Sequence, residues 1–221
     1  MEHGPDTPST ALAELLAGNR RFVTGRRIHP NQDAEYRATL AQEQRPFAVV
    51  FGCSDSRLAA EIIFDRGLGD LFVVRTAGHI VGAEVLASIE YGVSVLGAPL
   101  LVVLGHDSCG AILATLDTIA GRLEPGPGLT AIIDRVTPSI NTAAVHGVTA
   151  ADDIAAVHVE RTMDMITERT ALAAPVAAGT CGVVGLTYRL ADGRITVAGS
   201  RPRDLAEPGL VRGNTSVDAV G

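Results

Sequence analysis

The chain contains 221 residues, enough for one α/β domain with a full hydrophobic core. Apolar residues make up 47% of the chain and charged residues only 19%, which excludes an intrinsically disordered protein. The formal net charge is −7 and the basic residues are scattered, so nucleic acids and anionic membrane surfaces are disfavoured as partners.

The cysteine content and the hydropathy indicate the compartment. Three cysteines are too few for a disulfide framework, and their odd number indicates reduced thiols. The N-terminus has no basic segment followed by an apolar stretch, so no signal peptide is predicted. The apolar runs are too short to span a bilayer. We therefore expect a cytoplasmic protein.

Apolar periodicity and turn residues predict helices and strands that alternate along most of the chain. In chain order they are helices over 11–24 and 34–44, a strand over 47–52, a helix over 58–65, a strand over 71–75, a helix over 83–96, a strand over 100–104, helices over 110–121, 129–144 and 151–173, and strands over 182–190 and 194–198.

The alternation of strands and helices indicates a sheet with right-handed crossovers. We expect an α/β fold with a mainly parallel four-stranded sheet, an antiparallel edge strand and flanking helices. A single domain is predicted over 9–198, after a loose N-terminus (1–8) and before a Pro/Gly/Arg-rich tail (199–221).

Two of the predicted strands end in a glycine that is followed at once by soft metal ligands. The sequence CSDSR stands at 53–57 after one strand, and HDSC stands at 106–109 after another. Ligands of an open parallel sheet bind at the carboxyl ends of its strands, so Cys53, His106 and Cys109 can converge there. Two thiolates and one imidazole suit a tetrahedral zinc site with one position open, which is the pattern of a catalytic zinc.

Asp55 and Arg57 can control what occupies the open coordination position of the zinc. Two thiolates cancel the zinc charge, so a bound water needs help to ionise, and Asp55 can accept a hydrogen bond from the resulting hydroxide. Arg57 can hold Asp55 in a bidentate pair. Asp55 can instead bind the metal itself and displace the water, and both arrangements remain open. Taken singly, these residues could be buried thiols, a helix cap and a surface charge; their joint occurrence favours a zinc site.

With these two motifs the chain resembles the β-class carbonic anhydrases. The resemblance extends over most of the chain, with support from the segments 15–23, 72–75, 88–91 and 182–188. It implies Cys53, His106 and Cys109 as zinc ligands, with Asp55 either paired to Arg57 or bound to zinc. It also implies a homodimer as the building block, often assembled into a homotetramer.

The resemblance further implies a substrate pocket. A glutamine nine residues before the first cysteine contacts substrate in family members with an open site, and Gln44 has that position here. Phe72 and Tyr91 match residues of the pocket wall, although packing in the core would explain each of them equally well.

The chain departs from the family pattern after its second strand. Many members read Arg-Asn-Val-Ala-Asn, whereas this chain reads RTAGH over 75–79. Ala77 in place of valine predicts a slightly roomier pocket. His79 is a possible proton-transfer group, with an ordinary loop residue as the simpler interpretation. The four other histidines are expected to be surface or helix residues; these are His3, His29, His146 and His158. Cys181 is expected to be an inert buried thiol.

The sequence therefore predicts reversible hydration of carbon dioxide to bicarbonate and a proton, by attack of zinc-bound hydroxide. Asp55 would orient the hydroxide, Arg57 would fix Asp55, and Gln44 would position the substrate. Two alternatives remain. One is hydrolysis of a related small molecule such as carbonyl sulfide or carbon disulfide, and the other is a catalytically silent zinc protein that serves assembly.

Overall fold

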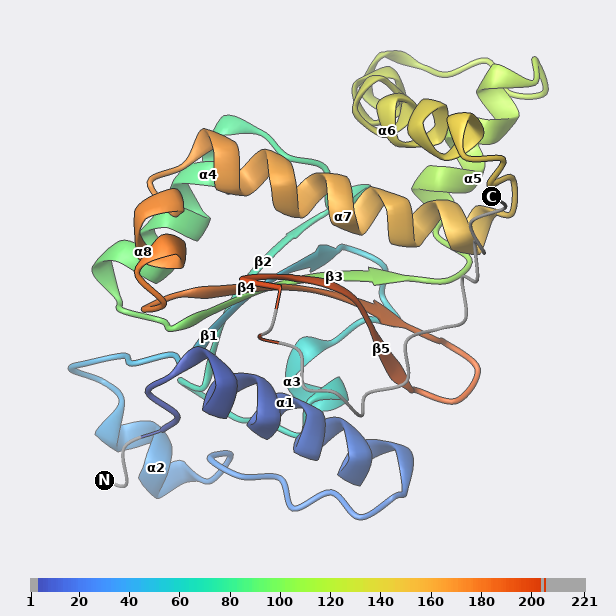
Figure 1. Ribbon diagram of the computed structural model, residues 1–221. Helices are drawn as coiled ribbons and strands as arrows, with labels where there is room; N and C mark the ends of the chain where they lie inside the picture. Colours follow the sequence, from blue (N-terminus) through green and yellow to red (C-terminus); the bar gives the residue numbers. More distant parts are fainter. Residues whose placement is uncertain (1–3, 204, 206–221) are drawn as a thin grey trace, which may run out of the picture.

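Five strands form one sheet in the spatial order β2 (Leu71–Thr76), β1 (Ala48–Cys53), β3 (Leu100–His106), β4 (Gly182–Tyr188) and β5 (Ile195–Arg201) (Figure 1). The computed structural model describes residues 4–203 and residue 205. The first four of these strands run parallel, and β5 is antiparallel to β4. The predicted fold class is thereby confirmed.

The two central strands are buried from end to end. Every residue of β1 and of β3 is buried, as expected for runs of Val, Leu and Phe in a parallel sheet covered on both faces. Gly105 in β3 allows a helix to approach this sheet closely, because a Cβ there would lie 2.5 Å from Cγ2 of Val159.

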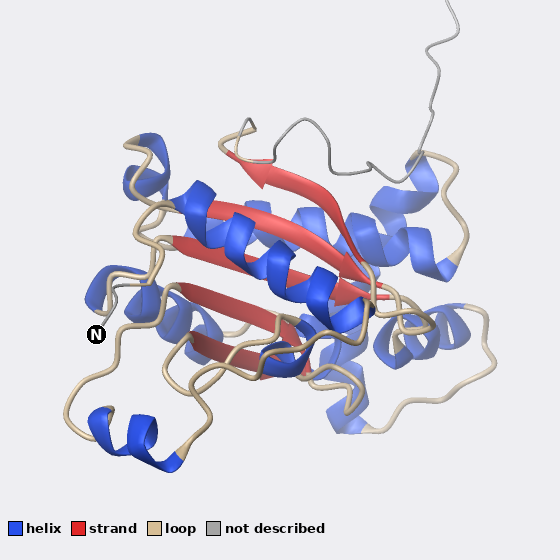
Figure 2. Ribbon diagram, turned by 90° about the horizontal axis from the view of Figure 1, so that it is seen from below, coloured by secondary structure: helices blue, strands red, loops and turns tan. Residues whose placement is uncertain are grey.

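Helices cover both faces of the sheet. The helices α1, α2 and α3 lie on one face, and α4, α7 and α8 lie on the other (Figure 1). Figure 2 is viewed from the side of α1 and shows this helix in front of the strands. The helices α5 and α6 lie beyond the sheet edge to which β3 points. Their bounds are α1 Pro8–Val23, α2 Ala34–Thr39, α3 Ala60–Ile63, α4 Ala83–Glu90, α5 Gly110–Ile119, α6 Pro127–Val145, α7 Ala151–Arg169 and α8 Ala173–Ala177, with a 3₁₀ turn η1 at Ala77–His79 and a π-helical turn η2 at Tyr91–Val95.

Several predicted boundaries were wrong. The helix expected over 83–96 changes into η2 at Tyr91, and the helix expected over 151–173 ends at Arg169. The last strand continues to Arg201, so the first residues of the predicted tail pair with β4. That pairing depends on a distant strand, which local composition does not reveal. Residues 1–3, 204 and 206–221 lie outside the described part of the chain, and the division into terminus, domain and tail stays a prediction.

None of the helices in the described residues combines the length and apolar character that crossing a membrane requires.

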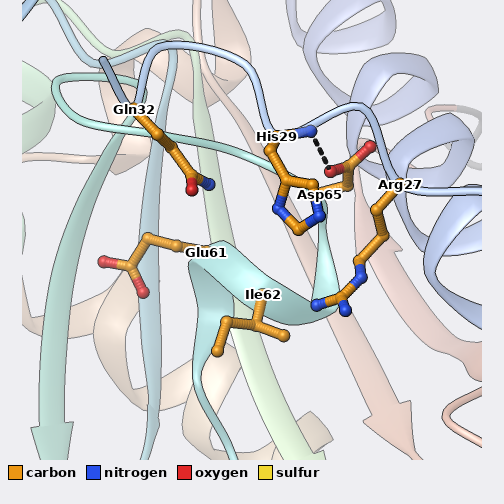
Figure 3. A pocket seen from close by; sticks show the side chains of 6 residues that line it. All are labelled: Arg27, His29, Gln32, Glu61, Ile62 and Asp65. Atoms are coloured by element: carbon orange, nitrogen blue, oxygen red, sulfur yellow. Dashed lines mark hydrogen bonds between the residues drawn. The ribbon is translucent and has the colours of Figure 1, made fainter.

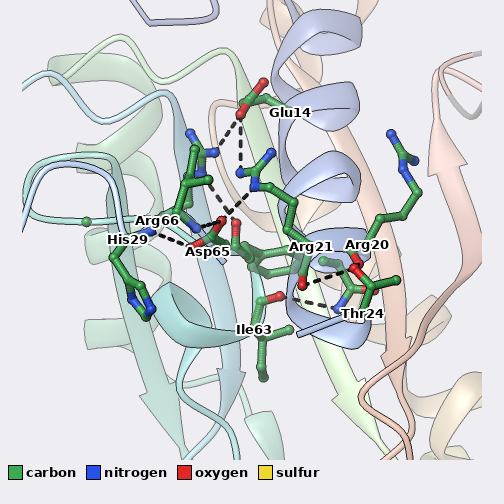
Figure 4. A network of polar contacts seen from close by, with 12 residues as sticks. Glu14, Arg20, Arg21, Thr24, His29, Ile63, Asp65 and Arg66 are labelled. Atoms are coloured by element: carbon green, nitrogen blue, oxygen red, sulfur yellow. Dashed lines mark hydrogen bonds and ion pairs between the residues drawn. The ribbon is translucent and has the colours of Figure 1, made fainter. Parts of the chain in front are cut away.

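A buried carboxylate fixes the turn after α3 to the end of α1 (Figure 4). The side chain of Asp65 is only 1% exposed, and its Oδ2 accepts a hydrogen bond from Nε of Arg21 at 2.6 Å. The amides of Ile28 and His29 also donate to this carboxylate, each at 3.1 Å. All these donors converge on one acceptor group, so its loss would leave them without a partner.

Substitution Asp65→Ala should therefore lower the free energy of unfolding by about 2–4 kcal/mol, since a partly buried guanidinium and two amides lose their acceptor. Urea denaturation at fixed protein concentration, followed by circular dichroism, measures this. Glu43→Ala is the control, because it removes an exposed pair with Arg45 and should leave the midpoint nearly unchanged. Equal midpoints for the two variants would contradict the role given to Asp65.

Candidate metal centre

The structure brings the three predicted metal ligands together at one edge of the sheet. Cys53 ends β1, His106 ends β3, and Cys109 directly precedes α5. The possible ligand atoms of these residues all lie within 4.8 Å of one another, and all three residues are buried. They meet because β1 and β3 are parallel neighbours, with Gly52 paired to Leu104.

The imidazole of His106 is oriented as a metal ligand should be. Its Nδ1 lies 2.7 Å from the carbonyl oxygen of Asp107, and a carbonyl can only accept, so Nδ1 carries the proton. Nε2 is then a free lone pair, and it is buried without a hydrogen-bond partner among the described residues. A backbone carbonyl that fixes the histidine tautomer in this way is the usual support of a zinc ligand. The donor set therefore fits zinc.

The two thiols differ in acidity because they lie next to each other in a buried site. The neighbouring Cys109 thiol lowers the pKa of Cys53 far below the ordinary thiol value, against the opposing effect of burial. The neighbouring Cys53 sulfur, together with burial, raises the pKa of Cys109. The pair therefore holds one thiolate and one proton, which a divalent cation must displace when it binds.

Asp55 is paired with Arg57 beside this cluster. Nε of Arg57 donates to Oδ1 at 2.9 Å, and Nη2 donates to Oδ2 at 2.7 Å, so both carboxylate oxygens are engaged. The hydrogen bond from Arg57 keeps the pKa of Asp55 well below its usual range, although burial acts in the opposite direction. Asp55 is consequently a carboxylate throughout the neutral pH range, and only strong acid would protonate it.

Two further side chains support the loops that carry the ligands, and neither role was predicted from the sequence. Arg75 donates to the carbonyl of Cys53 at 2.9 Å and to the carbonyl of Asp55 at 2.6 Å. Asp152, in the first turn of α7, accepts from the amide of Ser108 at 2.8 Å. Both act on backbone groups from distant elements, so no local motif marks them.

The predicted pocket residues lie elsewhere in the chain's own structure. Phe72 pairs with Val49 in the sheet, four residues before the level of Cys53, a distance of about 13 Å along a strand. Tyr91 packs against Phe72 with ring centroids 6.1 Å apart. Gln44 is exposed on the connection that precedes the amino end of β1. Within a single subunit, therefore, these three side chains do not lie beside the metal ligands.

Ala77 lies close to the ligands in the sheet register, because it follows Thr76, which pairs with Cys53. It is exposed, so its effect on pocket size stays a prediction.

Two histidines outside the metal cluster are buried. His79 is 1% exposed and His158 is 4% exposed, and their rings lie with centroids 4.3 Å apart and planes tilted by 41°. His158 is a helix residue, one of the two predicted settings, and it faces inward from α7. Neither ring nitrogen of His79 has a hydrogen-bond partner within the described residues, and burial keeps the pKa of this imidazole low. His29 and His146 are exposed as expected, and His3 lies outside the described residues.

Cys181 lies just before the amino end of β4, at the other end of the sheet from the metal ligands, and it is 1% exposed. Burial raises the pKa of its thiol to about 11, in agreement with the predicted inert residue.

A cavity of about 210 Å³ lies away from the metal-ligand cluster, between α3 and the connection after α1 (Figure 3). Its lining carries charges of both signs, among them Arg27, Glu61 and Asp65. The carboxylate of Asp65 is already saturated by the donors described above. The cavity therefore has no ligand set comparable to the cluster of two cysteines and a histidine.

Known proteins with similar sequences share one activity. A family model described as carbonic anhydrase matches residues 48–195. The chain is 54% identical over 189 residues to a carbonic anhydrase of Mycolicibacterium smegmatis, covering 85% of this chain and 92% of that protein. It is 50% identical over 192 residues to carbonic anhydrase 2 of Mycobacterium tuberculosis, covering 86% and 93%.

The fold is also similar to solved structures of this class. One of them comes from a study of two tetrameric β-carbonic anhydrases of the fungus Sordaria macrospora. It has a TM-score of 0.67 and 24% identity, with coverage of 84% of this chain and 95% of that one.

We expect the purified protein to contain about one zinc ion per chain, and Cys109→Ala to lose most of it, because removal of one soft ligand leaves an incomplete set. Cys181→Ala is a matched control, since that thiol is equally buried but lies at the opposite end of the sheet. Metal content is measured by inductively coupled plasma mass spectrometry. Zinc retained in full by Cys109→Ala would contradict the assigned ligands.

Proposed function

Because the chain belongs to the β-class carbonic anhydrase family, we propose that it hydrates carbon dioxide reversibly at a zinc ion held by Cys53, His106 and Cys109. The observation that carries this proposal is the buried cluster of two thiols and an imidazole next to an ionised, paired carboxylate. Since the ligands require reduced thiols and the three cysteines are free, we place the enzyme in the cytoplasm.

The bound metal and the protein would contribute different parts of the chemistry. Zinc held by Cys53, His106 and Cys109 would supply Lewis acidity, which makes a water molecule easier to deprotonate near neutral pH. The burial of Cys53 and Cys109 keeps competing water from the ligands, and His106 presents its lone pair in a fixed orientation. Asp55 offers a charged acceptor that can hold and orient the nucleophile's proton.

The pairing of Asp55 supports an open resting site. Arg57 engages both oxygens of the carboxylate and donates a third hydrogen bond from its backbone amide at 2.9 Å. A carboxylate held in this way would have to give up charge-assisted hydrogen bonds before it could bind a metal. We therefore propose that Asp55 stays paired with Arg57 and would not bind the metal in the resting site.

Substitution Arg57→Gln should lower kcat/KM for hydration by about 100-fold, because Asp55 loses its orientation and becomes free to swing toward the metal. Stopped-flow measurements over roughly pH 6.5 to 9 test this, and the wild-type profile should show no titration of Asp55 there. A carboxyl group with a lowered pKa loses its charge only as the pH falls through that low value. A wild-type enzyme with full zinc occupancy and no hydration at any pH would refute the proposed function.

We further propose that the site is completed by a second copy of the chain. Within the described part of the chain, strand β2 pairs only with β1, and its apolar residues stay half-buried, unlike those of β1 and β3. Tyr91, which packs on Phe72 of this edge strand, is 46% exposed. A homodimer formed over this region would cover the apolar edge and could bring Gln44, Phe72 and Tyr91 of one subunit toward the metal ligands of the other.

Mixing two inactive variants tests this arrangement. Gln44→Ala combined with Phe72→Ala disables the pocket, and Cys53→Ala disables the metal site. If the pocket belongs to the partner subunit, each mixed dimer regains one intact site, and random reassociation restores about one quarter of all sites. Hydration is measured after the two variants are unfolded together and refolded with zinc. A mixture that stays inactive, despite proof of mixed dimers by native mass spectrometry, would contradict the shared site.

A further inference from the structure

A backbone amide lies directly behind one of the metal ligands. The N–H of Gly78 points at Sγ of Cys53, with a nitrogen–sulfur distance of 3.3 Å. Gly78 has a left-handed backbone with φ 65° and ψ 23°, and a Cβ at this position would lie 2.6 Å from Cβ of Ala111. Both the dihedral angles and the space therefore require glycine, and the direction of its amide depends on how this residue is held.

The carbonyl of the same glycine is held by a buried histidine. Nε2 of His158, in α7, lies 2.9 Å from the carbonyl oxygen of Gly78. On the other side of the ring, Nδ1 lies 2.7 Å from Oγ of Ser139, in α6. A carbonyl can only accept, so Nε2 carries the proton and Nδ1 accepts from the serine hydroxyl.

This chain of contacts is complete and well shielded. Ser139 is 2% exposed, His158 is 4% exposed, and each ring nitrogen of His158 has a partner. The adjacent His79 differs, because neither of its ring nitrogens has a partner within the described residues. The contacts of His158 thus form one path from α6, through α7 and Gly78, to the thiolate of Cys53.

We propose that His158 is a positioning residue of the metal centre, which holds Gly78 so that its amide donates a hydrogen bond to the thiolate of Cys53. This inference rests on the proposed zinc site. An N–H donor stabilises the charge on a sulfur ligand and limits the electron density that the sulfur gives to the metal. Loss of this donor makes the zinc a weaker Lewis acid and the ligand set less well ordered.

The experiment compares holoenzymes with His158→Leu and His158→Gln. Leucine keeps the apolar packing and removes the donor, whereas the glutamine amide can still donate to Gly78. Two readouts do not depend on activity: the rate of zinc release to a chromophoric chelator, and the thiolate-to-cobalt charge-transfer absorption of the cobalt(II)-substituted protein. We expect about 10-fold faster release and a shifted band for His158→Leu, with partial recovery in His158→Gln. The midpoint of the pH profile for hydration should move upward in the leucine variant.

A matched variant separates this role from a general loosening of α7. Met163→Ala opens a cavity on the same helix, where the sulfur lies against Gly185 and away from Gly78. It should lower the thermal midpoint while zinc release and the cobalt spectrum stay as in wild type. If His158→Leu does not fold, Ser139→Ala replaces it, since loss of the hydroxyl should shift the same readouts in the same direction by a smaller amount.

The outcomes distinguish this inference from the proposed function. Wild-type zinc release and cobalt spectra in His158→Leu, or in Ser139→Ala when that variant takes its place, would overturn the positioning role. Changes of equal size in Met163→Ala would also overturn it. A wild-type protein that binds zinc and hydrates carbon dioxide would keep the proposed function intact in either case.

Discussion

The parallel pairing of β1 with β3 is the constraint on which the rest of the structure depends. Parallel neighbours end at the same sheet edge, so residues that are 53 positions apart in the chain become adjacent. The strands on either side of this pair hold its carboxyl end in place, with Thr76 of β2 opposite Cys53 and Tyr188 of β4 opposite His106. Any shift in the β1–β3 register would separate the thiol of Cys53 from the other two ligands.

A buried thiolate needs donors around it, and the fold supplies them from the backbone. The amide of Gly78 faces Cys53, and Arg75 holds the carbonyls that flank the Cys53–Asp55 turn. Among the described charged side chains, Arg57 is the one that forms an ion pair with the Asp55 carboxylate. The centre thus combines a thiolate stabilised by a backbone N–H with a carboxylate that is paired to Arg57 beside the ligands. This combination is consistent with a catalytic metal site.

The proposed dimer would connect catalysis to assembly. In one chain the aromatic pair Phe72 and Tyr91 lies toward the amino end of the sheet, whereas the ligands lie at the carboxyl end. The pair borders the exposed edge of β2, where a second copy could pack. A site shared between two subunits would explain why an apolar edge strand and a metal centre occur together on one small domain.

The sequence by itself determined which segments form the strands and which three residues are the candidate metal ligands, because both depend on local patterns. Apolar runs ending in Gly52 and Gly105 mark buried strands, and the residue types that follow them mark soft-metal chemistry. Tertiary structure alone decided that Asp55 pairs with Arg57 and that the pocket residues lie apart from the ligands. It also decided that His158 is buried behind Gly78 rather than exposed. Those features depend on contacts between elements distant in the chain, whose geometry no local spacing encodes.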